Sequence, residues 1–170
     1  HWEKQFENIW KKDGEKMNFR ILCIGKIKDG FYKRQIDGLC AGINAASHHI
    51  EITEFPDKRI PERMTDKGRE AFLEDECGRL MQRISPGDFV IALCIEGKEL
   101  GTKQHREYID RALRDGFDTV TYVIGGSLGL PEQIKRRANL KMSFSRMTFP
   151  HQMMRMVLCE EIAGITGSKE

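Results

Sequence analysis

The chain has 170 residues, of which 39% are hydrophobic and 32% charged, a balance typical of a soluble domain with its own core. It lacks both an apolar run of the roughly 18 residues needed to cross a bilayer and a secretory signal, so we expect a cytoplasmic protein with no membrane partner. The net charge of +2 leaves any nucleic-acid contact to a local patch, and five scattered cysteines without a CxxC pair predict reduced thiols and no metal site.

Residues 1–16 are polar, and we expect them to lie outside the domain as a non-native or upstream extension. The codons for Gly14-Glu15-Lys16, ahead of Met17, can form a purine-rich stretch that resembles a bacterial ribosome-binding site. The alternative is a real N-terminal helix. It is favoured by apolar residues at helical spacing, namely Trp2, Phe6, Ile9 and Trp10.

From Met17 onward, short apolar strands alternate with helices. We expect strands at residues 19–24, 50–55, 89–95, 120–124 and 140–144. We expect helices at residues 30–45, about 67–84, 102–115, 131–138 and 150–163, with a polar, mobile loop at 57–66. This alternation predicts an α/β fold with a mainly parallel sheet flanked by helices, and the apolar run 89–95 belongs at its centre.

Three strand ends carry residues suited to ligand binding, at 93–98, 124–129 and 143–152. In open α/β sheets, ligands bind beyond the carboxyl ends of the strands. Gly125 and Gly126 allow a ligand to approach the backbone closely, although a tight strand-to-helix turn explains them equally well on its own. The turn after the first strand lacks a GxGxxG pattern, which disfavours a nucleotide-dependent oxidoreductase and the common methyltransferase class.

Taken together, four stretches resemble the ribosomal RNA pseudouridine N3-methyltransferase family of the SPOUT superfamily. They are IGKIK at 24–28, IALCIEGK at 91–98, YVIGGSLGL at 122–130 and MSFSRMTFPHQ at 142–152. The resemblance extends from Met17 to about Ile162. It implies a methyltransferase domain at residues 17–163 with a C-terminal trefoil knot, the alpha-beta knot fold, which general folding rules would not suggest.

The resemblance also implies a binding site for S-adenosyl-L-methionine (SAM). Its residues would be Leu93, Gly125, Phe144, Ser145, Arg146, Met147, Thr148 and Phe149. Apolar Leu93, Phe144 and Met147 suit the two faces of adenine. The candidate catalytic groups are His151 and Arg155, although a lone histidine at a helix start is more often a capping or packing residue. The basic run at 135–137 is expected to be a solvated helix face.

By the same resemblance, the reaction is SAM-dependent methylation of N3 of a pseudouridine in 23S rRNA. The substrate would be the large ribosomal subunit or the 70S ribosome, because a chain of low net charge supplies few phosphate contacts. A two-fold homodimer is implied. It is supported by a last helix that is apolar nearly all round and therefore needs a second cover.

The family's usual ending is a Tyr-His-basic motif, which the atypical tail at residues 164–170 does not contain. Poor methylation is therefore an expectation for this chain. It keeps open an alternative, a catalytically impaired SAM- or ribosome-binding pseudoenzyme of the same fold.

Overall fold

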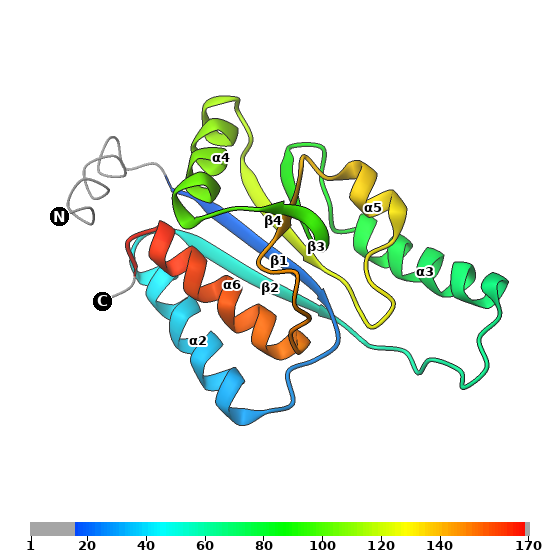
Figure 1. Ribbon diagram of the computed structural model, residues 1–170. Helices are drawn as coiled ribbons and strands as arrows, with labels where there is room; N and C mark the ends of the chain where they lie inside the picture. The colour runs from blue at the N-terminus through cyan, green and yellow to red at the C-terminus, as the bar shows by residue number, and fades with distance from the viewer. Residues whose placement is uncertain (1–15, 169–170) are drawn as a thin grey trace.

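A computed structural model describes residues 16–168, which form a three-layer α/β/α arrangement (Figure 1). One sheet holds five strands in the order β2-β1-β4-β3-β5, and all four pairings are parallel. The strands are β1 (Asn18–Ile24), β2 (His49–Phe55), β3 (Asp88–Glu99), β4 (Thr119–Ile124) and β5 (Leu140–Ser143). The predicted parallel α/β sheet is confirmed.

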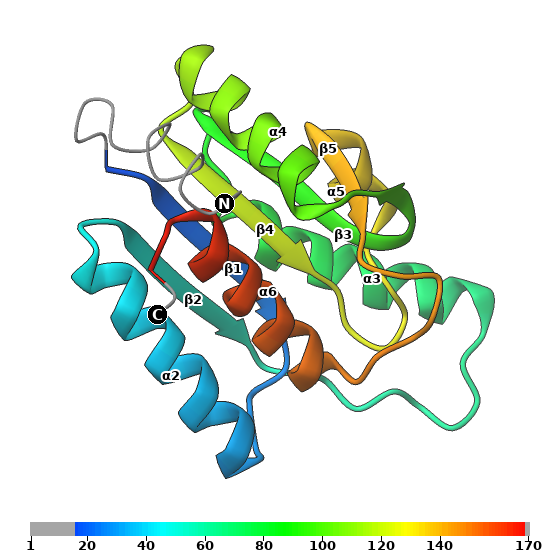
Figure 2. The same cartoon turned by 60° about the vertical axis from the view of Figure 1, so that its left-hand side comes forward.

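Helices cover both faces of the sheet, as the second view shows (Figure 2). One face packs against α2 (Gly30–Ala45), α4 (Thr102–Arg114) and α6 (His151–Ile165). The other packs against α3 (Asp66–Met81) and α5 (Glu132–Arg137). The alternation of β1 explains this division, because Ile21 and Cys23 enter the first core while Leu22 and Ile24 enter the second.

The ends of the chain differ in part from the expected boundaries. Residues 1–15 and 169–170 lie outside the described residues, so the expected extension and the last part of the tail are not seen. Helix α6 runs to Ile165, and Thr166 Oγ1 caps it by donating to the Ile162 carbonyl at 2.9 Å.

In the part of the chain that is described, no helix has the length and apolar character needed to cross a membrane.

The longest strand contains a bulge that the sequence did not predict. Leu93 and Lys98 of β3 both pair with Met142 of β5, so residues 94–97 bulge out of the ladder. A Cβ atom on Gly97 would lie 2.7 Å from the backbone of Met142, so the close approach of the two strands requires a glycine here. The bulge projects beyond the sheet at the edge where the candidate site lies.

Candidate functional site

A cavity of about 410 Å³ lies at the carboxyl ends of β3, β4 and β5. All the residues predicted to bind the cofactor line it except Arg146, and His151 lines it as well. The structure therefore brings together three strand ends that are far apart in the sequence. Arg146 points elsewhere: its side chain is 91% exposed, and its Nε lies 3.5 Å from Glu99 Oε1.

The loop after β4 folds back on itself at one wall of this cavity. A Cβ atom on Gly125 would lie 2.7 Å from the carbonyl carbon of Gly129 and 2.9 Å from the nitrogen of Leu130. Gly129 has a φ of +80° and donates its N–H to the Gly126 carbonyl at 3.0 Å. Glycine at 125 is thus required by the fold of the loop itself, which in turn sets the shape of the cavity wall.

The segment between β5 and α6 forms the opposite wall and is held by two serines. Ser143 Oγ donates to the Ser145 carbonyl at 2.9 Å, and Ser145 Oγ accepts the Met147 N–H at 3.0 Å. This turn leaves the Met147 side chain 71% exposed at the rim. This wall therefore combines apolar Phe144 and Phe149 with hydroxyl-bearing Ser145 and Thr148, and a large flexible side chain lies at its mouth.

The two candidate catalytic residues have different surroundings. His151 is exposed at the start of α6 and lines the cavity. The side chain of Arg155 is only 2% exposed, and its Nη1 donates to Glu54 Oε2 at 2.7 Å. Its Nη2 donates to the carbonyls of Ile24 at 3.2 Å and Gly25 at 2.7 Å. Arg155 therefore fastens α6 to the ends of β1 and β2.

Comparison with known proteins identifies the family. The family model described as "Predicted SPOUT methyltransferase" matches residues 17–163. The chain belongs to the SPOUT methyltransferase family. The ribosomal RNA large subunit methyltransferase H 1 of Thermoanaerobacter pseudethanolicus is 37% identical over 153 residues, covering 86% of this chain and 94% of the relative. The ribosomal RNA large subunit methyltransferase H of Oenococcus oeni is 42% identical over 146 residues, covering 86% and 91%.

Solved structures agree at the level of the fold. A probable methyltransferase from Bordetella pertussis Tohama I has a TM-score of 0.51 and 12% identity, covering 94% of this chain and 99% of that one. This likeness supports the three-layer architecture of the SPOUT methyltransferase, and it concerns the fold alone.

Two charged residues on the cavity wall of this SPOUT methyltransferase were missed by sequence reasoning. Lys135 of α5 forms an ion pair with Glu96 of the β3 bulge, and both side chains line the cavity. The charges of Lys135 and Glu96 cancel. Their hydrogen bond raises the pKa of the Lys135 ammonium and lowers the pKa of the Glu96 carboxyl group, so both side chains stay ionised. The basic run at 135–137 is thus not simply a solvated face, since Arg137 also donates to the Ser85 and Asp88 carbonyls.

Gln152 ends the MSFSRMTFPHQ stretch at 142–152, and the sequence did not predict its role. Its Oε1 accepts the N–H groups of Lys28 at 3.1 Å and Asp29 at 3.0 Å. The first turn of α6 is therefore fixed to the loop that follows β1. This contact and that of Arg155 hold the helix that presents His151.

A buried carboxylate lies behind the glycine loop. Glu76 of α3 is 1% exposed, and its Oε2 lies 3.3 Å from the place where a Cβ on Gly126 would be. Its Oε1 has no hydrogen-bond partner among the residues that the structure describes. Burial raises the pKa of this carboxyl group, which makes it a destabilising element at neutral pH.

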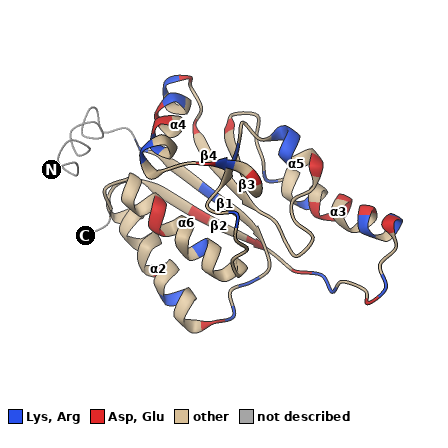
Figure 3. Ribbon diagram, in the orientation of Figure 1, with Lys and Arg blue, Asp and Glu red and all other residues tan. Residues whose placement is uncertain are grey.

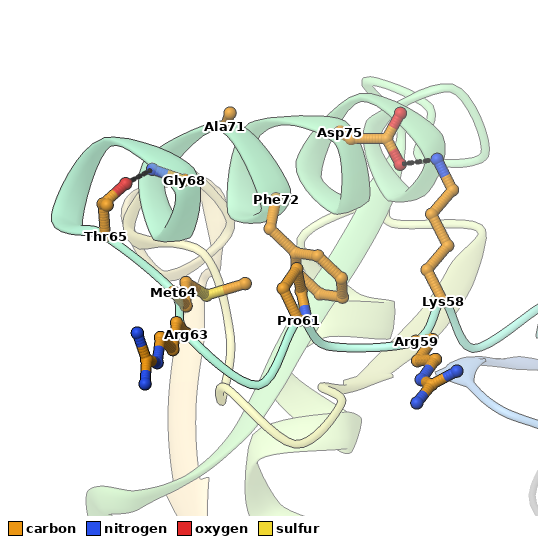
Figure 4. Close-up of a pocket in the computed structure, with 10 residues that line it drawn as sticks. All are labelled: Lys58, Arg59, Pro61, Arg63, Met64, Thr65, Gly68, Ala71, Phe72 and Asp75. Atoms are coloured by element: carbon orange, nitrogen blue, oxygen red, sulfur yellow. Dashed lines mark hydrogen bonds and ion pairs between the residues drawn. The ribbon is translucent and has the colours of Figure 1, made fainter.

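A second cavity, also of about 410 Å³, lies between the loop before α3 and that helix (Figure 4). Figure 4 shows Pro61 beside Phe72, and Lys58 reaching Asp75, with 2.7 Å between Nζ and Oδ2. None of the residues predicted for cofactor binding lines it. The residues predicted for cofactor binding therefore gather at the cavity at the strand ends and not at this second cavity.

Proposed function

We propose that this SPOUT methyltransferase transfers the methyl group of SAM to N3 of a pseudouridine in 23S rRNA, within the large subunit or the 70S ribosome. One observation supports the proposal most strongly. A single cavity is lined by three strand ends, each apolar or glycine-bearing, and all three lie within the part of the chain that matches the family. The names of the relatives, ribosomal RNA large subunit methyltransferases, support ribosomal RNA as the substrate.

The residues of the cavity fit SAM. Its volume of about 410 Å³ is in the range of small-molecule sites, roughly 300–1,000 Å³. Leu93, Phe144 and Phe149 offer apolar surface for adenine, and the loop that begins at Gly125 offers backbone groups for its edge. SAM supplies an activated methyl group when bound.

The protein must then align the target base and accept the N3 proton. His151 lines the cavity, and an imidazole side chain is chemically suited to act as the general base. The contacts of Arg155 suit a positioning role, in which it sets the place of α6 and therefore of His151. Catalysis at His151 and positioning by Arg155 make up our proposal for the active site.

We also propose that the chain is knotted at its C-terminal part. The strand β5 pairs with β3 at one edge of the sheet, whereas α6 packs against α2 near the other edge. The connecting residues 144–149 share the cavity with the loop after β4, so they pass across the ends of the central strands (Figure 2). This crossing is what a knot in this family would require.

A homodimer through α6 is part of the proposal. Only Arg155, Glu160 and Glu161 are charged in this helix, fewer charged residues than in α3 or α4 (Figure 3). Val157 remains 38% exposed after the monomer has folded. A second subunit is the cover that we propose for this surface.

A cytoplasmic location follows from the ribosomal substrate. Nothing in the comparisons supports the impaired pseudoenzyme.

Methyl-labelled SAM tests the proposal with three substrates prepared from cells that lack the modification: free 23S rRNA, large subunits and 70S ribosomes. We expect label in the RNA of ribosomal particles and much less in free RNA. Transfer to none of the three, by protein that binds SAM, would refute the proposed activity.

A further inference from the structure

The ion pair between Glu96 and Lys135 lies at the wall of the cavity at the strand ends. Both side chains line the cavity, and they come from the β3 bulge and from α5. The Lys135 side chain is only 18% exposed, and its Nζ also lies 3.4 Å from Glu132 Oε1. One positive and one negative group therefore lie together at the wall of a cavity whose other lining residues are apolar, glycine, hydroxyl-bearing or histidine.

We propose that Glu96 and Lys135 form a clamp for the amino-acid end of SAM. The Lys135 ammonium binds the ligand's carboxylate, and the Glu96 carboxylate binds its ammonium. The inference rests on the proposed function, because it names how that same site recognises its cofactor.

Charge matching supports the clamp. The amino-acid end of SAM is a zwitterion, and the cavity wall presents the complementary pair of charges. In the free protein each charge compensates the other, so neither is left unpaired before the ligand binds. Binding exchanges the contact between Glu96 and Lys135 for two charge-assisted hydrogen-bonded pairs with the ligand, and the zwitterion does not change the net charge of the site.

The distribution of residues in the cavity supports a bound ligand whose amino-acid end lies at Glu96 and Lys135. Leu93, Phe144 and Phe149 supply the apolar surface suited to adenine. The bulge at residues 94–97 carries Glu96 out of the ladder and against α5. A ligand with one flat apolar end and one zwitterionic end matches a cavity with these two kinds of lining.

A structural role is the competing explanation, in which the pair only ties the bulge to α5. Two kinds of measurement separate the explanations. The first compares ligands that share adenosine but differ at the other end: S-adenosyl-L-homocysteine has the zwitterion, S-adenosyl-3-thiopropylamine has the ammonium alone, and 5′-methylthioadenosine has neither. The second compares single variants with the double variant Glu96→Lys, Lys135→Glu, which keeps an ion pair but reverses it.

Calorimetric titration of the full chain is the test. Lys135→Gln should weaken S-adenosyl-L-homocysteine binding by about ten-fold or more, with less than about two-fold change for the amine and for 5′-methylthioadenosine. Glu96→Gln should weaken the zwitterion and the amine but not 5′-methylthioadenosine. The reversed pair should lose the zwitterion while keeping 5′-methylthioadenosine. Lys141→Gln, which removes an exposed charge near Glu96 but outside the cavity lining, should leave all three affinities unchanged.

Equal weakening of all three ligands in the single variants, or full zwitterion affinity in the reversed pair, would overturn the clamp while leaving the cofactor assignment intact. Wild-type protein that binds none of the three nucleosides would overturn the cofactor assignment, and the clamp with it.

Discussion

Replacing Arg155 with methionine removes a cation that joins three elements and leaves a side chain of similar length in the core. The guanidinium donates to Glu54 at 2.7 Å, to the Gly25 carbonyl at 2.7 Å and to the Ile24 carbonyl at 3.2 Å. In Arg155→Met, two backbone carbonyls lose a charged donor and the Glu54 carboxylate loses its counter-ion. We therefore expect Arg155→Met to lower the free energy of unfolding.

The magnitude follows from these contacts. Breaking a buried ion pair by removing one partner typically costs about 3–5 kcal/mol, and each unsatisfied buried acceptor about 1–3 kcal/mol. Because Glu54 is 34% exposed, water replaces part of the lost interaction, so we place the cost near the lower figure. About 3 kcal/mol corresponds to a fall in Tm of roughly 6–12 °C for a domain of this size.

Thermal and urea denaturation at one protein concentration measure this cost. Arg155→Lys retains the charge but not the forked geometry, so its Tm should fall between those of the wild type and Arg155→Met. Arg146→Met is the matched control, because that arginine is 91% exposed and should change stability by less than about 0.5 kcal/mol. An unchanged Tm in Arg155→Met, together with lost methyl transfer, would show that Arg155 acts in catalysis and that our positioning role is wrong.

Gly125→Val forces a Cβ to within 2.7 Å of Gly129, so calorimetry should show at least a ten-fold loss of S-adenosyl-L-homocysteine affinity, and unchanged affinity would refute the loop's role. Because burial raises the pKa of Glu76, its protonated form favours folding below the ordinary glutamate pKa, and this contribution is lost as the pH rises through the folded-state value. Glu76→Gln should therefore raise stability by about 1 kcal/mol at pH 7 relative to wild type, with the advantage shrinking towards pH 4 in denaturation curves. Val157→Glu should shift light-scattering mass from dimer towards monomer, whereas a wild-type mass that stays at 19.6 kDa at all concentrations would contradict the dimer. Deleting residues 1–16 should leave Tm and cofactor affinity almost unchanged, and a large loss of either would show that the segment belongs to the domain.

The sequence predicted the strands and helices well because their signals are local. Most strands are short apolar or alternating runs that end at glycine, proline or polar residues, and most helices repeat apolar residues at helical spacing. The exception is β3, which continues to Glu99, beyond the expected end at residue 95. The cavity was also predictable, because parallel strands bring their carboxyl ends to one edge. Gly125 was predicted to bind the cofactor and does line the cavity, but the sequence could not show that its closest neighbours belong to its own loop.

The features that sequence reasoning missed depend on pairs of elements that are distant in the chain. The bulge at residues 94–97 arises from the register between β3 and β5, which no local pattern encodes. The pairing of Glu96 with Lys135 follows from that bulge and from the placement of α5. The contacts of Arg155 depend on where β1 and β2 end, so the same residue was a reasonable catalytic candidate in the sequence alone.

The most direct measurement is the chemical identity of the product. Large subunits or 70S ribosomes that lack the modification are incubated with the protein and SAM, and the nucleosides of the 23S rRNA are then separated and identified by mass spectrometry. We predict that one pseudouridine gains a methyl group at N3, with an equal amount of S-adenosyl-L-homocysteine released. Unmodified pseudouridine in all particles, with protein shown by calorimetry to bind the cofactor, would contradict the proposed reaction.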